Sequence, residues 1–179
     1  MRIVVFGTSG SGKTTLARRL SFACLLPLVE LDRINWQPGW RGLNIDDPAE
    51  FVRRVERATA GDAWVTDGNY SAVRTYLWAR ATHLVWLDYE RPVIMFRVIR
   101  RSVIRAFDRR ELWPGTGNRE SWRHWFKASH PISYAWNTWE RRRREGEARL
   151  QDPRFAHLVV LRLRRPSEAK EVVRQLQSG

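Results

Sequence analysis

Apolar residues along the chain follow two alternating patterns. One consists of short runs rich in valine, leucine and isoleucine, bounded by polar residues, glycine or proline. These runs predict strands at residues 2–6, 28–31, 63–66, 83–87 and 158–163. Between them, apolar side chains recur every three or four residues, as on one face of a helix. This spacing predicts helices at residues 13–24, about 48–61, about 71–80, 91–103 and 166–176.

Strands that alternate with helices predict βαβ units and therefore an α/β fold with a mostly parallel sheet. Right-handed crossovers then place helices on both faces of that sheet. A chain of 179 residues is expected to form one domain, residues 1–179. Residues 108–152 break the alternation, because they are rich in tryptophan and arginine and contain no strand pattern. We expect them to form a helical insertion at the ligand-binding edge of the sheet.

The first strand runs directly into a stretch that matches the phosphate-loop pattern G-x-x-x-x-G-K-[ST] in full. Its glycines let backbone N–H groups face phosphate oxygens, and the helix that follows adds the positive end of its dipole. The predicted nucleotide-binding residues here are Gly7, Thr8, Ser9, Gly10, Ser11, Gly12, Lys13, Thr14 and Thr15. Lys13 would reach the β- and γ-phosphates, and the Thr14 hydroxyl would bind Mg²⁺. The predicted cofactors are therefore ATP and Mg²⁺.

Two acidic residues follow predicted strands at the same edge of the sheet. Asp67 ends the third strand and would reach the Mg²⁺ ion, directly or through water. The alternative is an ordinary turn aspartate before Gly68. Asp32 follows the second strand and could orient a phosphoryl acceptor or take its proton. The alternative for Asp32 is a helix cap or a surface acid.

Tryptophans gather in two places outside the predicted strands and helices. Trp36 and Trp40 flank a Gln-Pro-Gly turn, where they could stack on a ring of the substrate, although such residues more often pack into a core. The insertion carries Trp113, Trp122, Trp125, Trp136 and Trp139. We expect these to form a small core of the insertion, with a protein-binding surface as the alternative.

Charge is distributed unevenly along the chain. The formal net charge is +13, and 21 of the 32 basic residues lie after Glu90, against 9 of the 19 acidic ones. A basic half of this kind indicates either a site that binds the phosphates of a nucleotide or a surface that binds nucleic acid. The run Arg141–Arg144 beside Trp136 and Trp139 is the best candidate for the latter. Consecutive arginines on a helix, however, point around it rather than to one face.

Other features of the composition exclude several classes. A single cysteine rules out a disulfide framework and a multi-cysteine metal site. No apolar run approaches the length of a membrane span, and the N-terminus lacks the pattern of a secretory signal. We therefore expect a cytoplasmic protein without a membrane partner. Whether it is a monomer or a homodimer stays open.

The phosphate loop, the block Leu-Asp-Arg-Ile-Asn-Trp-Gln-Pro-Gly-Trp at 31–40 and Asp-Gly-Asn-Tyr at 67–70 together resemble adenylate-kinase-like P-loop proteins. Within that family they are most similar to the subgroup labelled DNA topology modulation protein. The resemblance implies a three-layer αβα sandwich, a five-stranded parallel sheet in the order 2-3-1-4-5, and a lid after the fourth strand. Arginines of such lids lie over ATP, which nominates Arg97, Arg101 and Arg105, with Arg109 and Arg110 behind them. It also implies that the loop containing Arg165 contacts adenine.

These observations together predict an ATP-dependent kinase that transfers the γ-phosphoryl group to a small hydroxyl- or phosphate-bearing acceptor. Lys13, Asp32, Arg101 and Arg105 would be its catalytic residues, and Arg74 or Arg80 would hold an anionic group of the acceptor. One alternative is a nucleic-acid-binding NTPase or regulatory protein that uses the basic half of the chain. Another is a nucleotide-binding module without turnover.

Overall fold

A five-stranded parallel sheet forms the centre of the protein. The computed structural model describes residues 1–108, 111–119 and 131–178. The strands of the sheet are β1 (Arg2–Gly7), β2 (Leu28–Glu30), β5 (Trp64–Asp67), β6 (His83–Leu87) and β7 (Val159–Leu163). They lie in the order β2-β5-β1-β6-β7 and pair in parallel throughout. Numbered along the chain within this sheet, the order is 2-3-1-4-5, which confirms the α/β fold and its predicted topology.

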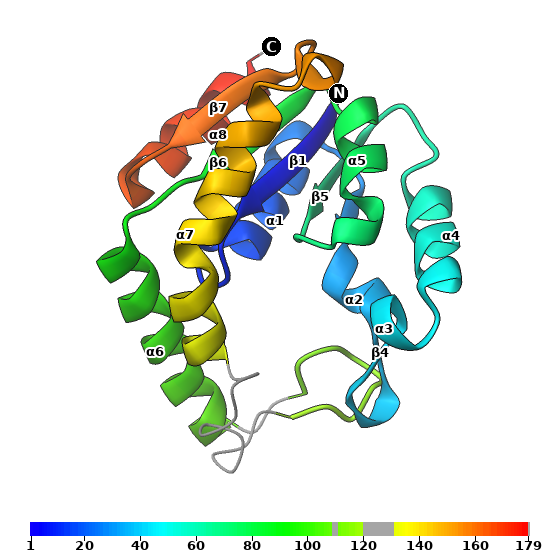
Figure 1. Ribbon diagram of the computed structural model, residues 1–179, viewed down its shortest axis with the longest axis vertical. Helices are drawn as coiled ribbons and strands as arrows, with labels where there is room; N and C mark the ends of the chain where they lie inside the picture. The colour runs from blue at the N-terminus through cyan, green and yellow to red at the C-terminus, as the bar shows by residue number, and fades with distance from the viewer. Residues whose placement is uncertain (109–110, 120–130, 179) are drawn as a thin grey trace.

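Helices cover both faces of the sheet, so the fold has three layers (Figure 1). The larger helices are α1 (Lys13–Cys24), α4 (Pro48–Ala58), α5 (Ser71–Arg80), α6 (Arg91–Asp108), α7 (Pro131–Leu150) and α8 (Ala169–Gln177). Side chains of α4 and α5 pack on the face of β1 that carries Val4 and Phe6. Those of α1, α6 and α8 pack on the opposite face, which carries Ile3 and Val5. The two-residue alternation of a strand thus supplies two separate cores.

Most predicted elements are confirmed, and one region is more structured than its sequence indicated. The helices at 13–24 and 71–80 and the strand at 83–87 have the predicted bounds. Residues 31–46 form two short helices, α2 (Leu31–Asn35) and α3 (Leu43–Asp46), and a small hairpin. The hairpin consists of β3 (Trp36–Gln37) and β4 (Arg41–Gly42), joined by a 3₁₀ turn at Pro38–Trp40. Elements this short bury too few residues to show a periodic pattern.

The predicted insertion is partly described. α6 extends to Asp108 rather than ending near residue 103, and α7 provides the second long helix, Pro131–Leu150. Residues 109–110 and 120–130 lie outside the described part of the chain. A Cβ atom at Gly146 of α7 would lie 3.0 Å from both Phe6 and Trp86, so the helix backbone approaches the sheet closely at this glycine. Among the described helices, none combines the length and the apolar character needed to cross a membrane.

Candidate active site

The phosphate loop joins β1 to α1 and has the backbone that its glycines predict. Gly10 and Gly12 adopt left-handed φ values of 82° and 97°. A Cβ atom at Gly10 would lie 2.0 Å from Val98 Cγ2, so α6 packs directly against the loop and leaves no room for a side chain. The Arg97 guanidinium donates to the Ser11 carbonyl oxygen at 2.8 Å. The loop is thus fixed from outside by the helix that the resemblance assigns to the lid.

Three polar side chains meet at the mouth of this loop. The Lys13 ammonium donates to the Thr8 carbonyl oxygen at 3.0 Å, and the Thr14 hydroxyl donates to Asp67 Oδ2. Burial lowers the pKa of Lys13 from its ordinary value of 10.5 to about 8, against the opposing charges of Asp67 and Asp32. Burial also raises the pKa of Asp67, opposed by the Thr14 hydrogen bond and the Lys13 charge. A buried cation and a buried carboxylate therefore lie close together at the phosphate loop. Ionisable groups with pKa values shifted by burial and by a charged neighbour are typical of functional sites.

The residues around Thr14 fit a magnesium ion. Among the described residues, Asp67 Oδ1 and Ser11 Oγ are buried and have no hydrogen-bond partner. A buried carboxylate oxygen without a partner is costly, and hard oxygen ligands of this kind are those that Mg²⁺ prefers. Thr14 and Asp67 lie on adjacent elements, as predicted from the strand end and the phosphate loop. The turn alternative for Asp67 does not account for the unsatisfied oxygen.

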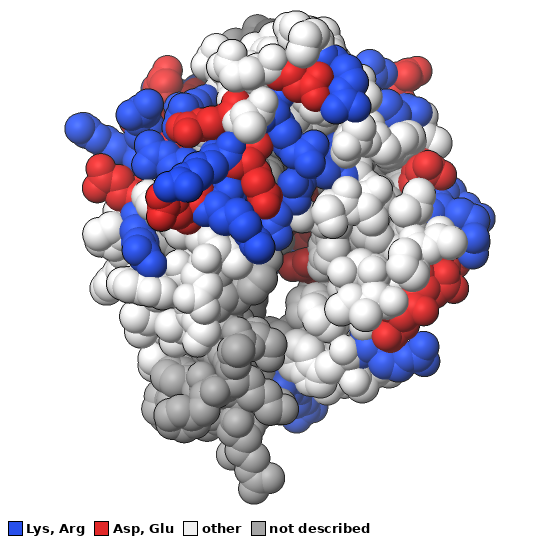
Figure 2. Space-filling view, viewed as in Figure 1, with Lys and Arg blue, Asp and Glu red and all other residues white. Residues whose placement is uncertain are grey.

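A cavity of about 1270 Å³ opens from the phosphate loop between the α6–α7 side and the α2–α4 side of the molecule. Figure 2 shows a hollow between these two sides. Its lining includes most of the residues that the sequence nominated: Ser9, Gly10, Ser11, Gly12, Lys13, Thr14, Thr15, Asp32, Asp67, Arg97 and Arg101. Gly7 and Thr8 lie behind it, where the Gly7 carbonyl accepts from Asn69 Nδ2 and the Thr8 carbonyl from Lys13.

Asp32 of α2 lines the same cavity as the phosphate loop. The Tyr70 hydroxyl donates to its Oδ1 at 2.6 Å, and α2 has no side-chain cap, so Asp32 does not act as the helix cap considered above. The negative charge of Asp32 favours the protonated form of Lys13 and so partly opposes the lowering of the Lys13 pKa by burial. Tyr70 and Asn69 belong to the Asp-Gly-Asn-Tyr block, yet neither was predicted to have a role of its own. Both follow β5 directly, which brings them to the same sheet edge as Asp67.

Arginines line the cavity from several elements. Besides Arg97 and Arg101, the lining includes Arg100 of α6, Arg33 of α2 and Arg142 of α7. The charges of Arg101 and Arg142 both lower the pKa of Lys13, which places them near the phosphate loop. The Arg105 side chain, Arg109 and Arg110 fall outside the described part of the chain. Arg165 is exposed and is not among the lining residues, whereas the adjacent Pro166 is.

Neither arginine expected to hold the acceptor reaches the cavity. Arg80 lies at the end of α5 away from the phosphate loop, donates to the Ala60 carbonyl at 2.9 Å and stacks on Tyr76. Arg74 is buried, donates to the Asn69 carbonyl at 2.9 Å and lies 3.5 Å from Glu145. That assignment was wrong, because helical spacing does not show which end or face of α5 meets the cavity. Arg33 and Arg142 line the cavity, whereas Arg74 and Arg80 do not.

The run Arg141–Arg144 is used within the protein. Arg141 and Arg142 pair with Glu145, Arg143 with Asp88 and Glu147, and Arg144 with Glu140. The four guanidinium groups thus point around α7, as predicted for consecutive helical residues. Figure 2 shows basic and acidic side chains interleaved on this side of the molecule rather than a uniformly basic face. The structure therefore does not favour a nucleic-acid surface on this run.

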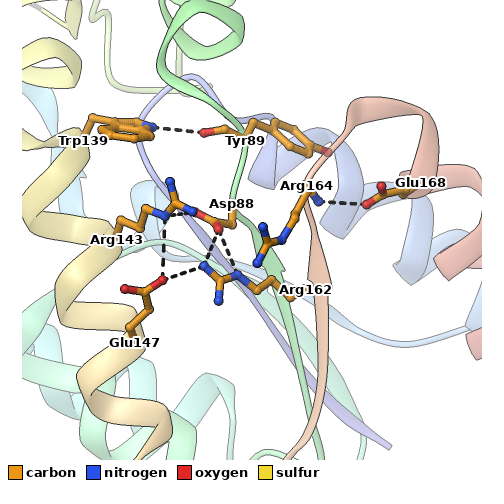
Figure 3. A network of polar contacts seen from close by, with 8 residues as sticks. All are labelled: Asp88, Tyr89, Trp139, Arg143, Glu147, Arg162, Arg164 and Glu168. Carbon is orange, nitrogen blue, oxygen red and sulfur yellow. Dashed lines mark hydrogen bonds and ion pairs between the residues drawn. The ribbon is translucent and has the colours of Figure 1, made fainter.

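A polar network fixes α7 to the sheet (Figure 3). The Asp88 side chain, 4% exposed, accepts from Arg162 at 2.6 and 2.9 Å and lies 3.3 Å from Arg143. Glu147 accepts from Arg162 at 2.7 Å, and the Trp139 indole donates to the Tyr89 carbonyl at 3.0 Å. These contacts tie α7 to the ends of β6 and β7. They hold the helix that presents Arg142 to the cavity.

The tryptophans of the insertion do not form a core of their own in the described residues. Trp113 packs on Trp36 and Trp40, which lie more than 70 residues earlier in the chain. Trp139 packs with the sheet, and Trp136 is exposed with the Arg91 guanidinium 3.6 Å from its ring centre. Trp122 and Trp125 fall outside the described residues. Composition showed where tryptophans gather but not which distant residues they contact.

Comparisons with known proteins identify the fold. No protein-family model matches the chain, and no curated protein matches its sequence. A solved gluconokinase from Sinorhizobium meliloti 1021 matches with a TM-score of 0.53 and 19% identity over 99% of this chain and 89% of that one. A shikimate kinase from Aquifex aeolicus matches with a TM-score of 0.53 and 16% identity over 99% and 97%. A shikimate kinase from Acinetobacter baumannii matches with a TM-score of 0.55 and 15% identity over 98% and 89%. At these identities the likeness shows the P-loop kinase fold alone.

Proposed function

We propose that the protein is an ATP-dependent kinase that transfers the γ-phosphoryl group of MgATP to a small acceptor. One observation carries this proposal: a single cavity is lined by the phosphate loop, with Lys13 and Thr14, and also by the carboxylate of Asp32, whose charge acts on Lys13. A site that only bound nucleotide would not require this acid in the cavity of the phosphate loop. The solved kinases of the same fold, which are named for gluconate and shikimate, support a small hydroxylated acceptor.

The roles of the residues follow from their positions. Loop N–H groups and Lys13 would hold the phosphates, and Mg²⁺ bound at Thr14 and Asp67 would neutralise charge on them. Asp32, oriented by Tyr70, would bind the acceptor hydroxyl and accept its proton. Arg101 and Arg142 would offset charge on the transferring group, and Arg33 would hold an anionic group of the acceptor. Phosphoryl transfer depends mainly on positioning and charge, and these residues supply both.

A screen with labelled ATP tests the proposal. Nucleosides, nucleoside monophosphates, sugar acids and cyclic polyols would each be incubated with the wild-type protein and with Lys13→Ala. We expect label transfer to at least one acceptor class, reduced about 10³-fold in Lys13→Ala. Lys170→Ala, which removes an exposed lysine of α8, is the matched control and should behave as wild type. Equal transfer by Lys13→Ala and wild type, or no transfer to any acceptor, would contradict the proposal.

A further inference from the structure

Three tryptophans from two distant segments form one cluster on the wall of the cavity. Trp36 and Trp113 stack with ring centres 5.5 Å apart, and Trp40 packs edge-on against both at 5.8 Å. All three line the cavity. The two core clusters of the described residues include none of them. The cluster is therefore neither the buried core nor the insertion core expected from the sequence.

The spacing of the indoles shows how a ligand can meet them. A ring inserted between two indoles needs carbon contacts of about 3.5 Å on each side, hence about 7 Å between the flanking rings. The observed 5.5 and 5.8 Å are those of direct contact. A ligand therefore cannot enter the cluster. It meets the outer surface of the indoles, which form an apolar wall made of the stacked pair Trp36 and Trp113 and of Trp40, whose ring stands nearly perpendicular to theirs.

Asn118 fixes this wall. Asn118 is only 2% exposed. Its side-chain oxygen accepts a hydrogen bond from the backbone N–H of Trp40 at 2.9 Å, and its side-chain amide donates to the Gln37 carbonyl oxygen at 2.9 Å. Trp40 has a left-handed backbone with φ of 61°, which is unfavourable for a residue with a Cβ atom. Such a conformation persists where its surroundings impose it. Asn118 thus holds Trp40 in place and ties residues 111–119 to the turn at 36–42.

Polar groups line the same cavity alongside the tryptophans. They include Asp32, Arg33 and Asn44. A ligand in the cavity can therefore meet a carboxylate and a guanidinium as well as the apolar surface of the indoles. Pockets of this composition orient a ligand through a few polar groups and gain affinity from apolar contact.

We propose that Trp36, Trp40 and Trp113 form an acceptor-selecting wall, and that the acceptor carries a ring whose face packs on these indoles beside the group bound by Asp32. Asn118 is the positioning residue of the wall. The inference rests on the proposed kinase function in that it identifies the bound ligand as the phosphoryl acceptor. Binding of the ligand to the wall does not require turnover. The ring can be a nucleobase or a cyclic polyol, since a nucleobase presents a planar π face and a cyclic polyol presents an apolar face of C–H groups, and either can pack on an indole.

Calorimetric titration in saturating MgADP tests this site without requiring catalysis. The probes are cytidine for a nucleobase, shikimate for a cyclic hydroxy acid, and gluconate for an open-chain hydroxy acid. We expect cytidine or shikimate to bind about tenfold more tightly than gluconate, the size of effect that stacking on an aromatic ring supplies. Trp113→Leu should weaken the ring compound about tenfold and leave the affinities for gluconate and MgADP within twofold.

Two further variants separate the wall from general damage to the fold. Trp136→Leu removes an exposed tryptophan of α7 that does not line the cavity, and it should leave every affinity unchanged. Asn118→Ala keeps all three indoles but releases them, so ring binding should weaken at least threefold and the near-ultraviolet circular dichroism of the stacked indoles should decrease. Thermal melting checks that each variant is folded. If Trp113→Leu does not fold, Asn118→Ala provides the test.

Three results would overturn the inference: no binding of either ring compound, equal binding of gluconate, or unchanged ring affinity in both Trp113→Leu and Asn118→Ala. Failure of the proposed kinase function looks different. In that case no phosphoryl group is transferred to any acceptor, while ring binding and its sensitivity to Trp113 persist.

Discussion

The two halves of the cavity are built in opposite ways. The half that we propose binds the nucleotide is largely one continuous stretch, Ser9–Thr15, completed by Asp67 from a strand adjacent to β1. The acceptor half draws on separate segments: α2 with Asp32, the turn at 36–42, the loop after β5, residues 111–119 and α7. The first half follows from local backbone conformation, while the second depends on how distant segments pack. Substitutions should therefore affect the two halves through different physical causes.

The largest effect is expected at Gly10 in the nucleotide half. Gly10→Ala places a Cβ atom 2.0 Å from Val98 Cγ2 at a residue with a φ of 82°. Backbone strain and overpacking should together lower the free energy of unfolding by about 3 kcal/mol. MgADP binding should be lost with it. Chemical denaturation and calorimetry measure the two quantities.

Gly39→Ala is the matched control in the acceptor half. Gly39 has a similar left-handed φ of 73°, but nothing lies within 4 Å of its Cβ position. It should cost only the backbone strain, about 1 kcal/mol, and leave MgADP affinity unchanged. Equal costs at Gly10 and Gly39 would show that the contact between α6 and the phosphate loop contributes nothing.

Asp32→Asn should separate the two halves functionally. The amide still accepts from the Tyr70 hydroxyl but cannot take a proton, so we expect kcat to fall about 10²-fold, equivalent to about 2.7 kcal/mol. MgADP affinity should stay within twofold, because the substitution leaves the phosphate loop intact. Steady-state kinetics with the acceptor found in the screen, together with calorimetry, measure both. Asp62→Asn, at an aspartate side chain 98% exposed, is the control. A parallel loss of MgADP affinity would place Asp32 in the nucleotide half.

A smaller effect is expected where α7 meets the sheet. Gly146→Ala brings a Cβ atom to 3.0 Å from Phe6 and Trp86. The gain in helix propensity, about 1 kcal/mol, is outweighed by an overpacking cost of about 2 kcal/mol, which leaves a net destabilisation of about 1 kcal/mol. Displacement of α7 should also lower kcat, because it moves Arg142 relative to Lys13 and the transferring phosphoryl group. Gly61→Ala, with open space at its Cβ position, should change neither value. A stabilised Gly146→Ala protein would mean that α7 can shift at no cost.

The smallest effect is expected for Arg144, whose partner Glu140 is also exposed. Arg144→Ala should change the unfolding free energy by less than about 0.5 kcal/mol, because exposed ion pairs contribute little. Turnover should be unchanged. Titration of DNA against wild type and Arg144→Ala at several salt concentrations gives the complementary measurement. A steep salt dependence in wild type that decreases in the variant would support a nucleic-acid partner and contradict the internal role of the arginine run.

The fold was largely predictable because its signals are local. Short β-branched runs and helical spacing identified the strands and helices of the central sheet, and parallel pairing followed from their alternation. The hairpin at 36–42 shows no such pattern, since its strands have only two residues each. Its position depends on contacts with Trp113 and Asn118, which are distant in the sequence. Arg74 and Arg80 of α5 were misassigned to the site because sequence spacing does not show which end or face of a helix meets the cavity.

The residues of the phosphate loop could be placed from the sequence alone. A phosphate loop is made of consecutive residues whose glycines dictate the backbone, so Lys13 and Thr14 are placed by the chain that immediately surrounds them, and Asp67 is placed by the end of its strand. The proposed acceptor half, in contrast, depends on contacts between distant segments. Trp113 and Asn118 meet the turn at 36–42 across more than 70 residues, and Arg142 reaches the cavity because Asp88 and Arg162 hold α7 on the sheet. Contacts over such separations depend on packing, which no local pattern in the sequence encodes.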